Sequence, residues 1–221
     1  MQFHRRLSYT GPLPAGIRIM NPFRESKLAL PMLQQFCDRF YSDNRPRKLL
    51  LGINPGRHGG GITGIPFTDT KRLQSELGIA YQGKPSHEPS AEFIYSMIDA
   101  FGGPDVFYGQ VYINSPCPLG FVSQTEKGTE VNYNYYDSPA LQEMVKPFMV
   151  KSVRALIALG MKTDTVYCLG TGKNEKVLQA LNREYGFFGK LVALEHPRFI
   201  MQYKRKFISE YIQKYIDALR D

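Results

Sequence analysis

Tryptophan is absent from this 221-residue sequence, and cysteine occurs only three times. Cys37, Cys117 and Cys168 are widely spaced and form no CxxC pair. They cannot supply the four thiolates of an iron–sulfur cluster or a structural zinc site, and each lies in an apolar run typical of a reduced core thiol. Four histidines are too scattered to predict a metal site, so no metal and no cofactor is expected. They are His4, His58, His87 and His196.

Long hydrophobic runs are missing as well. No segment approaches the roughly 18 uninterrupted apolar residues that a membrane-spanning helix requires. The first residues, MQFHRRLSYTGPLP, lack the apolar stretch of a signal peptide. The sequence therefore predicts a cytoplasmic protein with no membrane partner. Its length suits one domain over residues 1–221, because no repeat or linker divides it, and a monomer is expected.

Common nucleotide-binding and hydrolase motifs are also absent. The glycines directly after the predicted strand at 49–51 do not follow the G-x-G-x-x-G order of a dinucleotide motif, and the sequence contains no G-x-S-x-G nucleophile elbow. Gly172-Lys173 resembles the end of a phosphate-binding loop, but Tyr167 stands where such a loop needs glycine, and Asn174 where it needs Ser or Thr. Gly170 and Gly172 are more typical of turn residues that end a strand.

Positive charge, in contrast, is in excess. Lys and Arg total 28 against 20 Asp and Glu, which gives a formal net charge of +8 and a sequence pI of about 9.3. This balance favours a polyanionic partner, with nucleic acid as the leading candidate. Solubility alone explains the same excess, so charge by itself discriminates little.

Apolar periodicity predicts strands that alternate with helices. Central strands are expected at 49–51, 106–113, 165–169 and 191–194, with an edge strand at 17–20. Helices are expected at 27–41, 69–77 (N-cap Thr68), 90–101 (N-cap Ser90), 138–159, 174–181 and 207–219. Residues 125–137 are polar and rich in tyrosine, which indicates a surface excursion. The alternation predicts an α/β fold with a mostly parallel four-stranded sheet covered on both faces.

The segment 48–67, KLLLGINPGRHGGGITGIPF, carries the strongest local signal. A buried strand at 49–51 breaks directly into a turn, and glycine then recurs through the segment. Glycine just after a buried strand lets the backbone approach a ligand closely, since no Cβ intervenes. In an open α/β sheet, ligands bind just past the carboxyl ends of the strands. Asn54 is therefore predicted at the mouth of a site that the ring of Phe67 closes.

Polar side chains follow three of the predicted strands. They are Asn54, the neighbours Asn114 and Ser115, and His196. Because the carboxyl ends of parallel strands share one edge of a sheet, we expect these residues to converge on one site.

The residues after His196 mix basic and apolar side chains. In the stretch RFIMQYKRK, Arg198, Lys204 and Arg205 interleave with Phe199 and Ile200. Such a mixture suits a loop that tracks a nucleic-acid backbone and displaces a base. A solvated helix start with some core residues explains the pattern equally well.

Residues 52–67 resemble the first motif of a known family, G-M-N-P-G-P-F-G-M-A-Q-T-G-V-P-F, without a gap. The family is the SMUG-type (single-strand-selective monofunctional) branch of the uracil-DNA glycosylase superfamily. Its second stretch, P-x-V-F-F…H-N-L-C-P-L-x-F, is similar to residues 104–121, and its closing motif begins like His196-Pro197. The likeness spans most of the chain, which looks like a bacterial SMUG-like subfamily. The matching positions of the first motif are Gly52, Asn54, Pro55, Gly56, Gly59, Thr63, Gly64, Pro66 and Phe67.

The resemblance implies the uracil-DNA glycosylase fold, a three-layer α/β/α sandwich, and roles for individual residues. Asn54 would hold the attacking water, Phe67 would stack on a base flipped out of DNA, and His196 would donate a hydrogen bond to the departing base. The backbone at Ile53 and Gly56 would line the base pocket. No lysine lies in these motifs to form a Schiff base, so the resemblance implies a monofunctional enzyme that leaves an abasic site.

One departure from the family pattern concerns the base. The family's base-reading Asn falls on Ser115, and Asn114 lies one position earlier. Neighbouring residues leaving a strand point to opposite sides, so Asn114 is not expected to substitute simply for the missing amide. Serine is shorter and makes fewer hydrogen bonds. We therefore predict weaker discrimination of uracil and acceptance of other deaminated bases, xanthine foremost.

Two other departures concern the pocket wall and the DNA contacts. His58 and Gly60 replace a Phe and a Met, which opens the wall and leaves His58 either in contact with DNA or on an exposed loop. The family's closing-loop Arg falls on Ile200, which leaves three candidates for the residue that wedges into DNA. The candidate DNA contacts are His58, Arg198, Phe199, Ile200, Lys204 and Arg205.

The predicted function is that of a base-excision-repair DNA glycosylase. It would hydrolyse the N-glycosidic bond of uracil, and of bases such as xanthine, in single- or double-stranded DNA. The alternative is a catalytically weak nucleic-acid-binding protein that retains the fold. A nucleosidase acting on small molecules is a third hypothesis.

Overall fold

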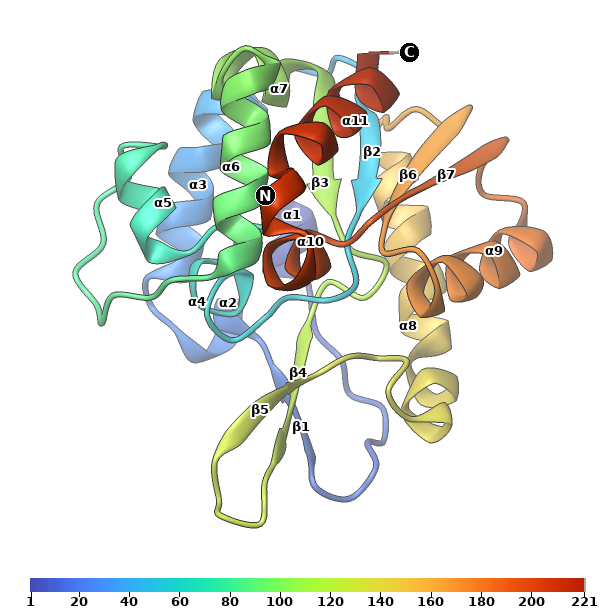
Figure 1. The fold of residues 1–221 in the computed structure, drawn as a ribbon. Helices are drawn as coiled ribbons and strands as arrows, with labels where there is room; N and C mark the ends of the chain where they lie inside the picture. Colours follow the sequence, from blue (N-terminus) through green and yellow to red (C-terminus); the bar gives the residue numbers. More distant parts are fainter. Residues whose placement is uncertain (221) are drawn as a thin grey trace.

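A four-stranded parallel sheet forms the centre of the protein. The structure is a computed structural model, and it describes residues 1–220. The strand order is β3-β2-β6-β7, and helices lie on both faces (Figure 1). This is the predicted α/β sandwich. The central strands are β2 (Lys48–Leu51), β3 (Val111–Asn114), β6 (Thr165–Leu169) and β7 (Lys190–Leu194). The helices are α1 (Gln2–Arg5), α2 (Pro22–Glu25), α3 (Ala29–Phe40), α4 (Gly60–Thr63), α5 (Thr70–Ser75), α6 (Pro89–Phe101), α7 (Pro104–Gln110), α8 (Pro139–Ala158), α9 (Lys173–Tyr185), α10 (Pro197–Tyr203) and α11 (Ile208–Arg220), with a 3-10 turn η1 (Arg205–Phe207).

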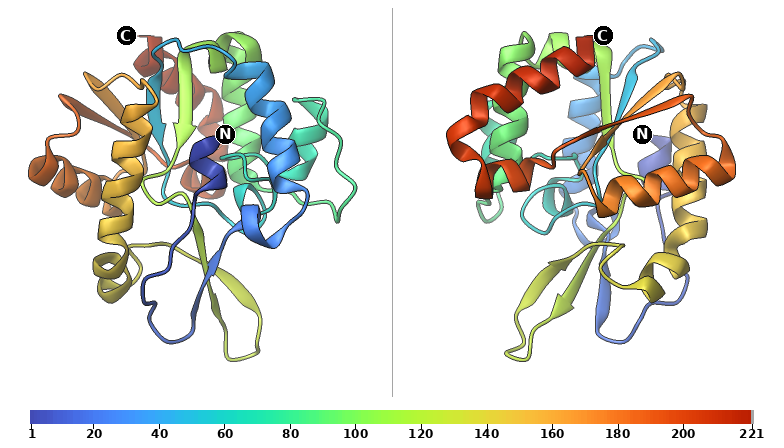
Figure 2. Two further views of the ribbon diagram at one scale, coloured as in Figure 1. Left: turned by 180° about the vertical axis from the view of Figure 1, so that it is seen from behind. Right: turned by 45° about the vertical axis from the view of Figure 1, so that its right-hand side comes forward.

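The side-chain alternation of β2 divides the core into two layers. Leu49, Leu50 and Leu51 are each 0% exposed. Leu50 packs in the layer built with α3, α6, α7, α10 and α11, whereas Leu49 and Leu51 pack in the layer built with α8 and α9. Figure 2 shows these two sets of helices on opposite sides of the sheet. A continuous apolar run is what a parallel strand covered on both faces requires.

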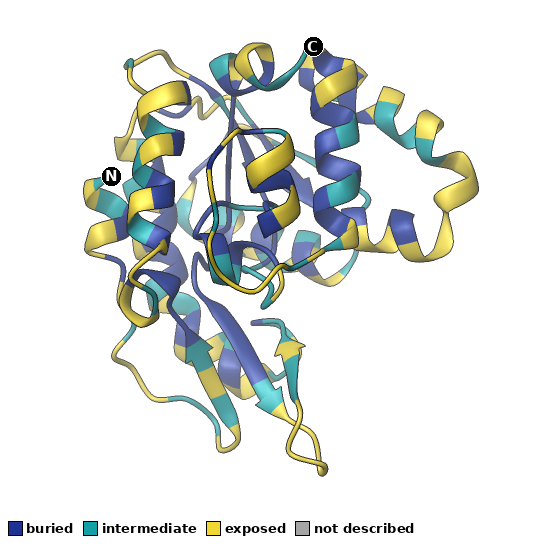
Figure 3. Cartoon of the chain, turned by 90° about the vertical axis from the view of Figure 1, so that its left-hand side faces the viewer, coloured by how far each residue is buried: buried dark blue, intermediate teal, exposed yellow. Residues whose placement is uncertain are grey.

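A second, antiparallel sheet extends from the body of the protein. It has the order β1-β4-β5, with β1 (Ile17–Met20), β4 (Gly120–Gln124) and β5 (Glu130–Tyr133). The predicted edge strand at 17–20 is thus present, at the edge of this smaller sheet. The prediction of a plain surface excursion at 125–137 is wrong, because β5 pairs with β4 and Tyr135 is fully buried. Residues 124–129 at the tip of the β4–β5 hairpin are exposed, and β5 itself is only partly buried (Figure 3).

Residues 106–110, predicted as part of a central strand, form helix α7 instead. The chain turns at Gly103, whose φ is 89°, and Pro104 occupies the first helical turn, where its missing N–H costs nothing. Phe107 and Tyr108 are then buried against α3 and α6 rather than in the sheet. The strand itself is confined to Val111–Asn114. The sequence prediction was wrong here because aromatic and β-branched residues alone do not distinguish a short helix from a strand.

Two predicted helix caps are displaced by one or two residues. Asp69, not Thr68, caps α5, and its carboxylate accepts the N–H of Arg72 at 2.8 Å. Thr68 instead bonds to Tyr95 through its hydroxyl group. α6 begins at Pro89 with Glu88 as N-cap, so Ser90 lies inside the helix. The other predicted helices are present, and Ser138 caps α8 as expected.

Buried His4 makes the stability of the fold sensitive to acid. Its Nδ1 has no hydrogen-bond partner, and burial lowers its pKa from 6.5 to about 3. The unfolded chain therefore binds a proton between those values that the folded protein does not, and stability falls as the pH drops below 6.5. At pH 4.5 the loss from His4 is about 2–3 kcal/mol. We expect His4→Leu to remove this part of the stability loss, measured as the change in the urea midpoint of unfolding between pH 7.5 and 4.5. A variant whose midpoint falls as much as that of the wild type would contradict this.

Candidate active site

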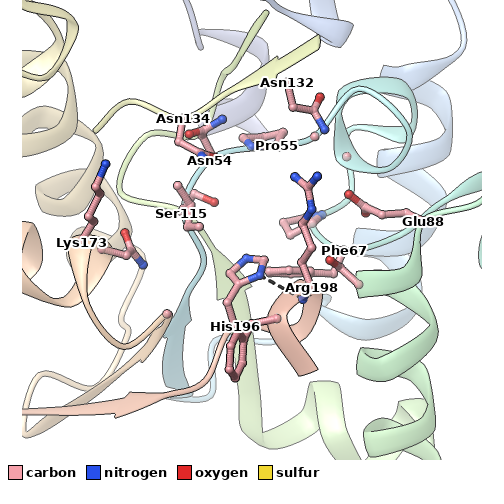
Figure 4. Close-up of a pocket in the computed structure, with 18 of the residues that line it drawn as sticks. Asn54, Pro55, Phe67, Glu88, Ser115, Asn132, Asn134, Lys173, His196 and Arg198 are labelled. Carbon is pink, nitrogen blue, oxygen red and sulfur yellow. Dashed lines mark hydrogen bonds between the residues drawn. The ribbon is translucent and has the colours of Figure 1, made fainter. Parts of the chain in front are cut away.

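One cavity of about 310 Å³ opens at the carboxyl ends of the central strands. The residues after β2 contribute Asn54, those after β3 contribute Ser115, and those after β7 contribute His196 (Figure 4). The predicted convergence of strand ends is therefore present. Ile53, Gly56 and Phe67 also line the cavity.

The amide of Asn54 is held in one orientation by backbone groups of the segment after β5. Its Nδ2 donates to the carbonyl oxygen of Tyr133 at 3.2 Å, and its Oδ1 accepts the N–H of Tyr135 at 3.1 Å. Because one partner only accepts and the other only donates, the amide cannot be flipped. Its second N–H and second lone pair stay free for a water molecule in the cavity.

A buried hydrogen-bond network supports the two hydrogen bonds that hold Asn54, here called the Asn54 clamp. The hydroxyl of Tyr135 bonds to Oδ1 of Asn174, at the start of α9. Nδ2 of Asn174 donates to the carbonyl oxygen of Leu169 at 2.9 Å, at the end of β6. Asn54 follows β2, and this network also ties it to the end of β6, so its side chain is rigidly supported.

The glycine loop shapes the floor of the cavity and carries Phe67. Phe67 is the only non-glycine residue of the described chain with a positive φ, 51°, a strained backbone that proteins retain mainly at functional sites. Its ring lies against Gly52, where a Cβ would stand 3.0 Å from Cε2 of Phe67. Thr63 holds the bend, since its hydroxyl donates to the carbonyl oxygen of Thr68 at 2.7 Å. Glycine at position 52 is thus required by the close approach of the aromatic ring.

His196 faces the cavity as a neutral hydrogen-bond donor. Its Nδ1 accepts the N–H of Arg198 at 3.1 Å and caps α10, so the proton of the neutral ring lies on Nε2. Burial, with a smaller effect of Arg198, lowers the pKa of His196 to about 4. The ring centroid lies 5.8 Å from that of Phe67. A flat ring placed on Phe67 would therefore meet the imidazole at its edge.

Ser115 and Asn114 differ in their access to the main cavity, although both line a second, small cavity of about 20 Å³. Ser115 lines the main cavity, whereas Asn114 does not. Asn114 is 3% exposed, and its Oδ1 accepts the N–H of Ser115 at 2.8 Å. Asn114 therefore positions the backbone of Ser115 instead of facing a substrate.

The predicted DNA contacts fall into two groups. Arg198 and Phe199 are exposed on α10 and line the mouth of the cavity, and Lys204 is exposed just beyond α10. Ile200 is 0% exposed and packs in the core, so its prediction as a DNA contact is wrong. The cause is the helical turn of α10, which directs residue 200 inward while it directs Phe199 outward.

The remaining predicted contacts lie away from the mouth or are already paired. His58 is exposed and does not line the cavity. Arg205 is exposed, but it pairs with Glu92 on α6 at 2.8 Å. Tyr203, which is not among the predicted DNA contacts, lines the mouth and is 66% exposed, and its ring lies 5.5 Å from that of Phe199. Two exposed aromatic rings thus stand beside the opening.

Several other residues of the cavity were not selected from the sequence. The two-residue spacing of Asn132, Asn134 and Tyr136 could have identified them as one face of an extended segment, although β5 itself ends at Tyr133. Lys173 is exposed at the mouth, with Nζ 5.9 Å from the ring centroid of Tyr136. Glu88 enters from the N-terminus of α6, and no local sequence pattern indicates its role.

Residues 1–220 contain no cluster of three His, Cys, Asp or Glu side chains that could hold a metal ion. Within the same residues, no helix combines the length and the apolar character needed to cross a bilayer.

Comparison with known proteins identifies a family and a solved structure that this chain resembles. The family described as "Uracil DNA glycosylase superfamily" matches residues 39–220. The solved structure of SMUG2 from Pedobacter heparinus is similar at a TM-score of 0.97 and 58% sequence identity, covering 99% of this chain and 94% of that chain. The central sheet and its helices thus have the fold of that family.

Proposed function

The chain belongs to the uracil DNA glycosylase superfamily, and we propose that it hydrolyses the N-glycosidic bond of deaminated bases in DNA, uracil and xanthine among them. One observation carries the proposal: the fixed amide of Asn54 and the neutral imidazole of His196 face the same cavity beside the ring of Phe67. A base inside a duplex cannot reach that cavity, so it would be extruded at a cost of a few kcal/mol.

The two side chains suit opposite ends of the breaking bond. As the C1′–N bond breaks, the sugar gains positive charge and the base gains negative charge. Nε2–H of His196 would donate to an oxygen of the departing base, where a preorganised donor is most effective. The Asn54 amide would orient water toward C1′, although it cannot act as a strong base. A dissociative reaction needs little nucleophilic activation, so a neutral amide suffices.

We further propose a monofunctional reaction that leaves an abasic site. Lys173 is the lysine that lines the mouth, and its amine lies against the Tyr136 ring rather than beside Asn54 and His196. Borohydride should therefore trap no covalent adduct between the protein and uracil-containing DNA.

The test of the proposal is base release from a panel of oligonucleotides. Uracil, xanthine and hypoxanthine would each be placed in single- and double-stranded DNA, and alkali-labile sites would be quantified. Release of uracil supports the proposal. DNA binding without base release would favour a nucleic-acid-binding protein, and cleavage of free nucleosides would favour a nucleosidase.

Ser115 is expected to set the breadth of base recognition, because it faces the cavity with one short hydroxyl group. An Asn at this position presents both a donor and an acceptor to the base. We predict that Ser115→Asn raises the ratio of uracil to xanthine release about tenfold, the discrimination worth one good hydrogen bond of about 1.4 kcal/mol. Rates measured with the two substrates in competition test this, and a wild-type enzyme that already releases uracil alone would contradict it.

A further inference from the structure

Glu88 presents to the cavity a carboxyl group that the proposed reaction of uracil does not use. Its backbone N–H donates to Oδ2 of Asp69 at 2.7 Å, which fixes the start of α6. Its side chain is directed from α6 into the cavity (Figure 4). Among residues 1–220, no side chain or backbone group forms a hydrogen bond or ion pair with this carboxyl group.

The glycine loop provides the space that the carboxyl group occupies. A Cβ at Gly56 would stand 2.8 Å from Oε1 of Glu88, and a Cβ at Gly59 would collide with Oε2. Gly56 follows Asn54 by two residues, so the segment that carries the water-binding amide also seats the carboxyl group. Glu88 is therefore part of the cavity wall rather than a solvated surface residue.

The surroundings of Glu88 favour a carboxyl group that still carries a proton near neutral pH. Burial raises its pKa to about 7; the Asp69 carboxylate raises it further, and Arg198 lowers it. Asp69 forms an ion pair with Arg72 and lies near His87. Arg72 also contacts the carboxylate of Glu92. If a DNA phosphate pairs with Arg198, the guanidinium stabilises the Glu88 carboxylate less, and the proton is held more firmly.

Uracil and a purine differ in what they would offer to this group. A purine carries a second ring, whose N7 accepts a hydrogen bond, whereas the corresponding edge of uracil carries only C–H groups. A purine stacked on Phe67, with its six-membered ring toward Ser115 and His196, would turn the five-membered ring toward α6. Glu88 is the acidic side chain on that side of the cavity.

We infer that Glu88 is a catalytic acid selective for deaminated purines such as xanthine, and that it donates its carboxyl proton to N7 of the extruded base. The inference rests on the proposed glycosylase function. As the C1′–N9 bond breaks, its electron pair stays on the purine, and N7 takes the proton from Glu88. Water adds to C1′ and releases one proton, and the Glu88 carboxylate regains one proton from solvent. Atoms and charge balance to water plus glycoside giving base plus abasic site.

The test compares release of xanthine and uracil under single-turnover conditions by wild type and by Glu88→Gln. The variant keeps the shape of the side chain but has no acidic proton. Xanthine release should fall about 100-fold, the lower end for loss of a general acid, while uracil release changes less than about threefold. Glu210→Gln, an exposed glutamate on α11, is the matched control and should leave both rates unchanged.

The pH profile of the wild type gives a second readout that needs no variant. Xanthine release should fall about tenfold per pH unit above 7 as Glu88 loses its proton, relative to uracil release measured in the same buffers. Equal losses for both bases in Glu88→Gln, or parallel pH profiles, would overturn the inference. A wild type that releases uracil but no purine would overturn it too. If the wild type releases neither base, the proposed function fails first.

Discussion

Replacing Asn54 with alanine is expected to lower the single-turnover rate of uracil release about 10²- to 10³-fold. The amide is the group held at the cavity by Tyr133 and Tyr135, and alanine leaves the water without an orienting partner. Losses of this size are typical when one positioned catalytic group is removed. DNA affinity should change little, because no phosphate contact is lost.

The measurement is the rate of formation of alkali-labile sites with enzyme in excess, together with DNA affinity by fluorescence anisotropy. Asn44→Ala is the matched control, because Asn44 is exposed and does not line the cavity. An Asn54→Ala variant that releases uracil at more than a tenth of the wild-type rate would contradict the role of the amide.

Removal of the His196 imidazole should lower the rate of uracil release by a similar factor, because this group acts on the base side of the breaking C1′–N bond. His196→Ala is expected to slow uracil release about 10²- to 10³-fold, because the departing base loses its donor. The same variant also loses the side-chain cap of α10, a stability cost of about 1 kcal/mol. His196→Asn separates the two effects, since Asn is a good N-cap but does not place a donor where Nε2 lies.

The pH profile of uracil release gives an independent check on His196. With a pKa of about 4, the ring stays neutral throughout pH 6 to 8, so its contribution should be constant over that range. A rate that follows a titration near 6.5 would show that the imidazole acts in its charged form. Near-normal release by His196→Asn would show that the residue only caps the helix.

The central fold and the main residues of the site were accessible from the sequence because they depend on local signals. The leucine run of β2 is continuous since both faces of the strand are covered, and glycine at position 52 is required by the ring of Phe67. The carboxyl ends of parallel strands share one edge of the sheet, which is why Asn54 and His196 could be predicted to lie at the same site.

Features that depend on tertiary contacts could not be predicted in the same way. The helical geometry of α10 directs Phe199 outward and Ile200 inward. The order of apolar and polar residues in this stretch is compatible with either a helix or a loop, so the sequence could not predict this. The clamp on Asn54 comes from backbone groups of residues 133 and 135, which have no sequence signature. Glu88 reaches the cavity only because α6 begins beside the glycine loop.

The account depends on an extruded base entering the cavity between Asn54 and His196. The most direct measurement is a crystal structure of Asn54→Ala bound to a single-stranded oligonucleotide that contains one uracil. The account predicts the uracil ring stacked on Phe67, with a base oxygen within hydrogen-bond distance of Nε2 of His196. Density that places the uracil outside this cavity, with the cavity occupied only by solvent, would contradict it.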